Sequence, residues 1–251
     1  MPKPLAKRSS EGHGDCPDVN TALDCLKKKG SKAGIEGMAR YAITSDRAFG
    51  VSMRDIQTLA KTLGRNHGLA AQLWASGWYE ARMLAAYVED PACVTAKQMD
   101  QWCRDFDNWA ICDTVCFALF DRTSHAWTKV EQWSRRQQEF EKRAAFALLW
   151  GLSVHDKNAS DDQFTAGLDL VERAANDERN FVKKAVNMAL RAVGKRNLVL
   201  NAAAREAASR LAASANVTER WIGKDALREL TSATVIKRIS KPVRTTKKIS
   251  R

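Results

Sequence analysis

Five segments of the chain share one pattern: YEARMLAAYV (79–88), WAICDTVCFA (109–118), FEKRAAFALL (140–149), FVKKAVNMAL (181–190) and WIGKDALREL (221–230). Each begins with an aromatic residue and carries apolar residues at helical spacing. Three positions after the aromatic, four of the segments have a base (Arg82, Arg143, Lys184 and Lys224), whereas the second has Cys112. The starts lie 30, 31, 41 and 40 residues apart. This spacing indicates a repeat array rather than a single globular core.

A further helical pattern precedes each of these segments, so the sequence predicts a series of helix pairs. The predicted pairs are Thr21–Tyr41, His67–Ala75 with Tyr79–Val88, Thr95–Phe106 with Trp109–Phe120, His125–Arg135 with Phe140–Val154, Asp161–Ala175 with Arg179–Val193, and Leu198–Ala213 with Thr218–Leu230. A single helix, Met53–Leu63, is predicted after the loop 42–51. Few prolines and glycines and no alternating strand pattern support helix throughout. We therefore expect an all-α fold: an α-solenoid of about six antiparallel HEAT-like pairs over residues 21–236.

The two ends of the chain differ from this repeat region. Residues 1–20 are polar and show no periodicity, so we predict that they are disordered. The net charge is +12, and residues 237–251 carry seven of the bases and no acid, which leaves +5 for the rest of the chain. This basic tail is interpreted either as an arm that binds nucleic acid, which we favour, or as a solubilising end.

The six cysteines form no CxxC motif. Cys112 and Cys116 lie one helical turn apart, but no histidine nearby in sequence completes a zinc site. We expect buried apolar thiols in a reducing compartment, with no metal and no cofactor. No secretory signal follows the start, and the longest apolar run, 144–150, is too short to cross a bilayer. The sequence thus predicts a soluble intracellular protein.

The segment that begins at Phe181 carries bases on one helical face, because Lys184, Met188, Arg191 and Lys195 follow each other at helical spacing. Like charges on one face repel each other, so an anionic partner explains this face better than a solvated stripe does. Equivalent positions of successive repeats line up along the concave surface, which predicts a row of phosphate contacts. The predicted contacts are Arg82, Lys184, Arg191, Lys195 and Lys224.

The second segment interrupts this row with an acid. Trp109, Asp113, Cys116 and Phe120 form an otherwise apolar stripe, and an acid in such a stripe needs a partner or a chemical role. One interpretation is an ion pair with Arg143, one repeat later, that locks two repeats together. The other is catalysis. The two are compatible, because an arginine can hold a catalytic carboxylate ionised and oriented.

Six short stretches, in this order, carry a resemblance to a known family. They are 48–52 (AFGVS), 80–84 (EARML), 106–113 (FDNWAICD), 142–146 (KRAAF), 179–187 (RNFVKKAVN) and 194–197 (GKRN). Because of these stretches, the chain resembles the bacterial DNA alkylation repair family, the HEAT-like-repeat glycosylases of the AlkD type, over about residues 32–238.

The resemblance implies a monofunctional DNA glycosylase that removes positively charged N3- and N7-alkylated purines from duplex DNA without a metal. It assigns Asp113 and Trp109 to the active site, together with Arg143 from the next repeat. Where the family has a second active-site tryptophan, this chain has Met188, which is expected to contact the substrate. The implied protein is a cytoplasmic, nucleoid-associated monomer that acts in base excision repair.

Two alternatives to a glycosylase remain from the sequence. The first is a HEAT-like protein that binds duplex DNA without cutting it, which the replacement at Met188 favours. The second is a protein-interaction solenoid, against which the row of bases argues.

Overall fold

The computed structural model describes residues 18–43 and 45–241, and these residues form helices, turns and loops without a strand. A 3₁₀ helix, η1, spans Phe120–Arg122. The α-helices are α1 Val19–Lys29, α2 Lys32–Ala39, α3 Met53–Leu63, α4 His67–Ala75, α5 Tyr79–Val88, α6 Ala96–Arg104, α7 Trp109–Ala118, α8 Ala126–Ser134, α9 Glu139–His155, α10 Asp161–Ala174, α11 Asn180–Gly194, α12 Leu198–Ala212, α13 Val217–Leu230 and α14 Ala233–Ile239.

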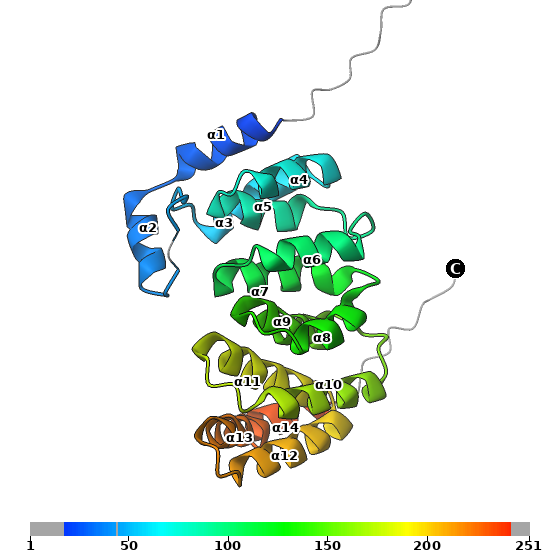
Figure 1. Cartoon of the computed structure of the whole chain (residues 1–251). Helices are drawn as coiled ribbons and strands as arrows, with labels where there is room; N and C mark the ends of the chain where they lie inside the picture. Colours follow the sequence, from blue (N-terminus) through cyan, green and yellow to red (C-terminus); the bar gives the residue numbers. More distant parts are fainter. Residues whose placement is uncertain (1–17, 44, 242–251) are drawn as a thin grey trace, which may run out of the picture.

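From α4 onward the helices form the predicted pairs, α4/α5 to α12/α13, and Figure 1 shows these pairs stacked one on the next. The second helices form a layer of their own, in which α5 packs against α7, α7 against α9, α9 against α11 and α11 against α13. This arrangement confirms the prediction of an all-α solenoid of HEAT-like pairs. The short helix α14, which packs on α13, was not predicted.

The N-terminal end of the array differs from the prediction. Helices α1 and α2 were expected to form the first pair, but α1 packs against α3, α4 and α5. Helix α2 buries none of its residues. Its sequence, KAGIEGMA, has too few large apolar side chains to form a helix-packing face. In Figure 1, α2 lies to one side of the stack.

A buried acid holds the loop that follows α2. The Glu80 carboxylate, on α5, accepts hydrogen bonds from the backbone N–H groups of Phe49, Gly50 and Val51 at 2.9, 2.7 and 3.2 Å. Gly50 has a φ of 76°, and a Cβ on Gly34 of α2 would lie 2.1 Å from the Gly50 oxygen. Only glycines allow this approach. The contacts tie α2 to the first repeats and so determine where its C-terminal end lies.

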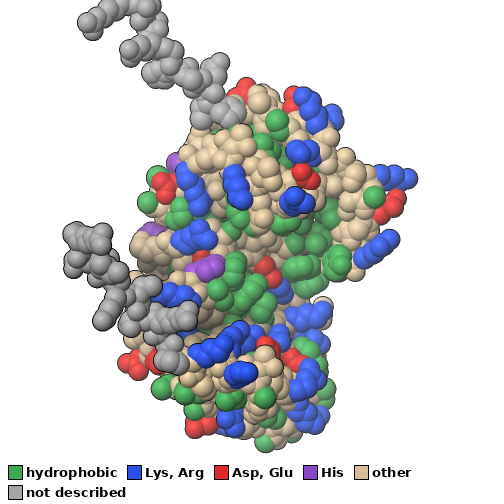
Figure 2. Space-filling view, turned by 180° about the vertical axis from the view of Figure 1, so that it is seen from behind, with side chains coloured by type: hydrophobic (Ala, Val, Ile, Leu, Met, Phe, Trp, Pro, Cys, Tyr) green, Lys and Arg blue, Asp and Glu red, His purple; other side chains and the backbone are tan. Residues whose placement is uncertain are grey.

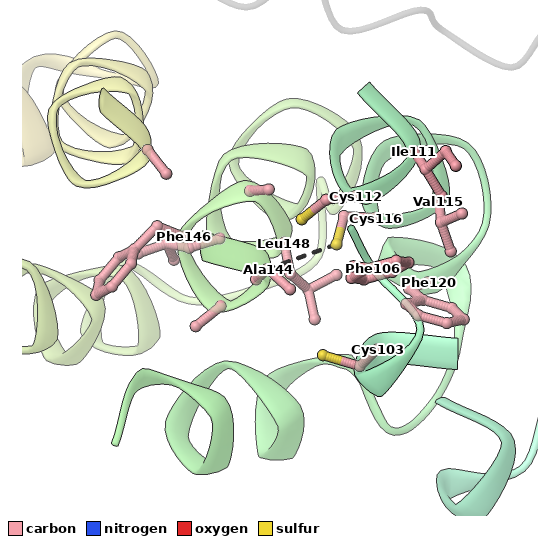
Figure 3. Close-up of a cluster of buried hydrophobic side chains, with 14 of the residues drawn as sticks. Cys103, Phe106, Ile111, Cys112, Val115, Cys116, Phe120, Ala144, Phe146 and Leu148 are labelled. Carbon is pink, nitrogen blue, oxygen red and sulfur yellow. Dashed lines mark hydrogen bonds between the residues drawn. The ribbon is translucent and has the colours of Figure 1, made fainter. Parts of the chain in front are cut away.

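Small side chains let the second helices approach each other closely. The Cys112 thiol donates to the Phe140 oxygen at 3.7 Å. In the buried cluster of Figure 3, the Cys116 thiol donates to the Ala144 oxygen at 3.6 Å. Burial raises the pKa of Cys116, so this thiol stays protonated and unreactive. Cys112 therefore belongs to the packing between α7 and α9. The expectation of buried cysteines is confirmed here, whereas Cys93 is exposed.

The predicted disordered segment and basic tail lie largely outside the described residues, which exclude 1–17, 44 and 242–251. At the inner edge of the first, Asp18 caps α1 by accepting the Thr21 N–H at 2.7 Å, so the helix begins inside the segment 1–20. At the inner edge of the second, residues 237–239 belong to α14. Among the described residues, no helix is both long and apolar enough to cross a membrane.

Candidate active site

A cleft of about 490 Å³ lies where the turn after α2 faces the N-terminal parts of α7, α9 and α11. Residues 40–42 of that turn form one side, and Trp109, Asp113 and Arg143 line it from α7 and α9. From α11 the cleft receives Asn180, Phe181, Lys184 and Met188. Figure 2 shows an indentation about halfway down the right-hand edge of the molecule, with hydrophobic side chains beside it and Lys and Arg side chains above and below.

Asp113 and Arg143 form a two-point ion pair at the base of the cleft. Arg143 Nε donates to Asp113 Oδ1 at 2.9 Å, and Arg143 Nη2 donates to Oδ2 at 2.6 Å. The third guanidinium nitrogen, Nη1, donates to the Phe181 carbonyl at 2.7 Å. One arginine therefore connects α7, α9 and the start of α11. The side chain of Arg143 is 6% exposed and that of Asp113 is 15% exposed, so the carboxylate is the more accessible partner.

The two partners titrate differently. Burial raises the pKa of Asp113, and the charge of Arg143 offsets this only in part. Burial acts to lower the pKa of Arg143, but Asp113 outweighs it and raises that pKa, so the arginine stays protonated. The cleft thus holds a carboxylate beside one permanent cation, and that carboxylate takes up a proton more readily than an ordinary Asp side chain does.

Trp109 is fixed by a contact that sequence spacing did not predict. Its indole Nε1–H donates to the Tyr41 carbonyl at 2.8 Å, across a separation of 68 residues. The next residue, Ala42, has a φ of 54°, an unfavourable value for a residue with a Cβ. Tyr41 itself is 69% exposed. Arg40 and Tyr41 are therefore cleft residues that the sequence analysis missed, because a single contact between distant segments leaves no periodic signal.

The predicted bases fall into two groups. Lys184 and Lys224 are exposed, and neither forms an ion pair with any residue that the structure describes. Arg191 Nη1 and Lys195 Nζ both contact Glu229 of α13, each at 2.7 Å. These two bases therefore bridge α11 to α13, and the expectation of an unneutralised basic face on α11 is wrong for its C-terminal half.

Arg82 also makes internal contacts. Its Nη1 donates to the Asp105 carbonyl at 3.1 Å, and its guanidinium lies 5.2 Å from the centre of the Trp74 ring. The side chain is 18% exposed. Arg82 consequently supports the packing of the loop between α6 and α7, and its predicted DNA contact stays untested.

The structure thus brings five of the predicted residues into one cleft and leaves four outside it. Those in the cleft are Trp109, Asp113, Arg143, Lys184 and Met188. Those outside are Arg82, Arg191, Lys195 and Lys224. In the described part of the chain, no three His, Cys, Asp or Glu side chains are grouped so that they could hold a metal ion.

The comparisons with known proteins concern the fold and the family of the chain. Among solved structures, a protein described as one of "a new family of proteins related to the HEAT-like repeat DNA glycosylases with affinity for branched DNA structures" has a TM-score of 0.70 to this chain. It is 21% identical in sequence, and the match covers 84% of this chain and 95% of that one, which establishes the shared fold. No curated protein sequence gives a significant match. The sequence profile of the family described as DNA alkylation repair enzyme matches residues 22–230. Because this match spans most of the chain and confirms the resemblance seen in the sequence, the protein belongs to the DNA alkylation repair enzyme family.

Proposed function

We propose that the protein binds duplex DNA across the cleft and hydrolyses the N-glycosidic bond of positively charged N3- or N7-alkylated purines, as a monofunctional glycosylase. One observation carries this proposal. Asp113 is the one acid among the described residues that line the cleft, and the others are bases, aromatic residues and uncharged side chains. A carboxylate is unfavourable on a surface that binds phosphate, unless it stabilises positive charge that develops on the substrate.

The chemistry requires no second catalytic acid. An alkylated purine carries a positive charge, so when the bond between the base nitrogen and the sugar C1′ breaks, its electron pair neutralises the base. The sugar becomes an oxocarbenium-like cation, as in glycoside hydrolysis. The Asp113 carboxylate stabilises this cation. A water molecule then forms the new C1′–O bond and releases its proton to the solvent or to Asp113.

The ion pair with Arg143 is compatible with this role. Each carboxylate oxygen has two lone-pair directions, and Arg143 uses one on each oxygen. The remaining directions are available to substrate or water on the exposed side of Asp113. Arg143 also fixes the carboxylate in one orientation, so little reorganisation accompanies the reaction. In this proposal Arg143 is a positioning residue and Asp113 is the catalytic residue.

The aromatic groups of the cleft suit a cationic base. Trp109 is held by its hydrogen bond to Tyr41, and a cation against an aromatic face gains about 0.5–2 kcal/mol. Met188 lines the cleft from α11 and supplies a polarisable apolar contact. In this proposal Lys184, which is exposed and lines the same cleft, contacts a backbone phosphate.

A second candidate function is DNA binding without base release. Met188 supports it, because this position lacks the aromatic ring that the family resemblance leads us to expect. The similarity to a protein with affinity for branched DNA also supports it. Under this alternative, Asp113 serves only to hold Arg143 between the repeats.

Base release from methylated duplex DNA distinguishes these functions. The protein is incubated in excess over DNA that carries 3-methyladenine and 7-methylguanine, and free bases are measured by chromatography beside an untreated duplex. Release above the spontaneous rate is expected for the wild type. Salt-dependent DNA binding without release would establish the binding function and overturn the glycosylase. Absence of both would overturn the proposed function as a whole.

A further inference from the structure

The aromatic residue that starts the repeated pattern in α13, Trp221, differs in its surroundings from the corresponding residues of the earlier second helices. Tyr79 is 7% exposed, and the rings of Phe140 and Phe181 pack together with centroids 5.3 Å apart. Trp109 is anchored through its indole nitrogen. Trp221 is 43% exposed. Terminal repeats normally carry polar residues where the next repeat would pack, so an exposed tryptophan at this position is unexpected for structure alone.

The surroundings of Trp221 favour a negatively charged, flat ligand. Lys183 Nζ lies 5.8 Å from the centre of the Trp221 ring. Lys184 and Lys224 are exposed on α11 and α13, each three residues after the aromatic residue of its helix. The neighbouring acid on the same face, Asp225, is engaged by Asn187 Nδ2 at 2.7 Å and by Arg228. An aromatic face next to uncompensated lysines is the combination that binds a nucleotide by stacking and charge.

This surface is continuous with the proposed DNA-binding cleft. Lys184 lines the cleft from α11, and the adjacent residue Lys183 lies over the Trp221 ring of α13, the next second helix, so Trp221 lies next to the helix that forms the edge of the cleft. Bases inside a duplex are stacked on both sides and cannot offer a face to a side chain. Along the duplex no base is therefore available to stack on Trp221, whereas an unpaired base in a single strand is.

We infer that Trp221, with Lys183 and Lys224, forms a stacking site for an unpaired base in a single-stranded extension of the DNA held in the cleft. The inference rests on the proposed DNA binding but not on base release. It adds a preference for duplexes that continue into a single strand, with a contact made on α13 outside the cleft that contains Asp113.

The test compares labelled DNAs of three kinds by fluorescence anisotropy: a blunt duplex, the same duplex with a thymidine extension at the 5′ or the 3′ end of one strand, and each extended duplex with abasic sugars in the extension. Stacking of one base predicts that the wild type binds one extended duplex about 5- to 10-fold more tightly than the blunt one. The abasic extension keeps the phosphates, so it should lose most of this gain.

Variants separate stacking from general packing. Trp221→Ala should bind the blunt duplex as the wild type does and lose the preference, whereas Trp221→Phe should retain most of it. Val217→Ala is the matched control, since Val217 lies one turn earlier and is 71% exposed. Equal affinity of the wild type for blunt and extended duplexes would overturn the inference, as would a preference that survives in Trp221→Ala. Failure to bind the blunt duplex at all would instead overturn the proposed DNA binding.

Discussion

Asp113 and Asp177 are bound by arginine in the same way, yet they lie in different surroundings. Arg179 donates to Asp177 through Nε at 2.9 Å and Nη2 at 2.6 Å, and its Nη1 donates to the Gln137 carbonyl at 2.6 Å. These are the same three kinds of contact that Arg143 makes around Asp113. Asp177 has a second cation, Lys142, at 2.9 Å. Asp113 has one cation and faces the cleft.

The pKa values of the two carboxylates move in opposite directions. Burial acts to raise the pKa of Asp177, but its hydrogen bonds with Arg179 and Lys142 outweigh it and lower that pKa from 3.8 to about 2. Burial raises the pKa of Asp113, because Arg143 alone does not compensate for it. A carboxylate with two cations stabilises the contact between repeats. One with a single cation stays available to a positively charged substrate.

The bases on α11 show the same contrast between cleft and repeat contact. Lys184 is exposed at the edge of the cleft. Arg191, two turns later, contacts Glu229 at 2.7 Å and is 31% exposed. The Lys184 charge at the cleft has no ion-pair partner among the described residues, whereas the charges of Arg191 and Lys195 between α11 and α13 are neutralised by Glu229. Comparing matched substitutions in the two regions tests this division.

The largest difference between the two sites is expected when the rates of base release by Asp113→Asn and Asp177→Asn are compared. Both substitutions keep the side-chain size and remove a charge that an arginine contacts. Asp113→Asn should lower single-turnover release by about 10²-fold or more, the effect of losing one preorganised electrostatic group. Asp177→Asn should stay close to the wild type. DNA affinity of Asp113→Asn should hold or increase, since a negative charge leaves the binding surface.

Stability must be measured beside release, because Asp113→Asn also leaves Arg143 without its ion-pair partner. Removing one partner of a buried pair costs about 3–5 kcal/mol in the free energy of unfolding. Release is therefore compared at a temperature where thermal melts show each variant to be folded. A variant that melts early but releases bases normally while folded would make Asp113 a structural residue and remove the contrast with Asp177.

The pH dependence of base release should follow Asp113. If the ionised carboxylate is required, release falls as the pH drops through the Asp113 pKa, by about tenfold per pH unit below it. Because burial raises this pKa above 3.8, the decline should begin at a higher pH than for an ordinary aspartate. Rates are corrected for spontaneous loss of bases in acid. A rate that is independent of pH over this range would exclude the ionised carboxylate from catalysis.

The free energy of unfolding should change with pH in opposite senses at the two sites. The lowered pKa of Asp177 contributes about 1–2 kcal/mol that is present above its unfolded pKa of 3.8 and is lost as the pH falls towards 2. The raised pKa of Asp113 makes its ionisation costly, so that cost appears as the pH rises from 3.8 through the folded value.

Urea unfolding of both Asn variants at several pH values checks this expectation. The destabilisation of Asp177→Asn should shrink in acid, and that of Asp113→Asn should shrink as the pH rises. Since the arginines stay protonated throughout, these slopes report the ionisation of the two carboxylates. If the destabilisation of the two variants changed with pH in the same direction and to the same extent, the two carboxylates would be electrostatically equivalent.

The solenoid and the centre of the site were predictable because both depend on repeat spacing. Apolar periodicity specifies each helix locally, and stacking then brings equivalent positions together. Asp113 and Arg143 lie one repeat apart, so an ion pair between them was foreseeable. The pairing of Arg191 with Glu229 had a signal as well, because Trp221, Asp225 and Glu229 follow each other at four-residue spacing on the facing helix.

Contacts outside the repeat spacing could not be predicted in the same way. The Tyr41 carbonyl reaches Trp109 only because α2 lies beside the array instead of packing on α1. The position of α2 depends on the buried Glu80, which binds the loop after that helix. In the sequence, nothing distinguishes Glu80 from any other acid on a helix. Both depend on the placement of a loop, which leaves no periodic pattern.

The smallest expected effect is the difference between Lys184→Ala and Arg191→Ala in the salt dependence of DNA affinity. Each phosphate contact that is lost reduces the slope of log affinity against log salt concentration by about 0.9. Lys184→Ala should show this reduction, because its charge is unpaired within the described residues and lies at the cleft. Arg191→Ala should leave the slope nearly unchanged while lowering the melting temperature slightly, since its charge is already neutralised by Glu229. Anisotropy titrations of a blunt duplex at several salt concentrations measure both slopes. An equal loss in the two variants would show that Arg191 exchanges Glu229 for phosphate when DNA binds, and that the basic face of α11 acts along its whole length.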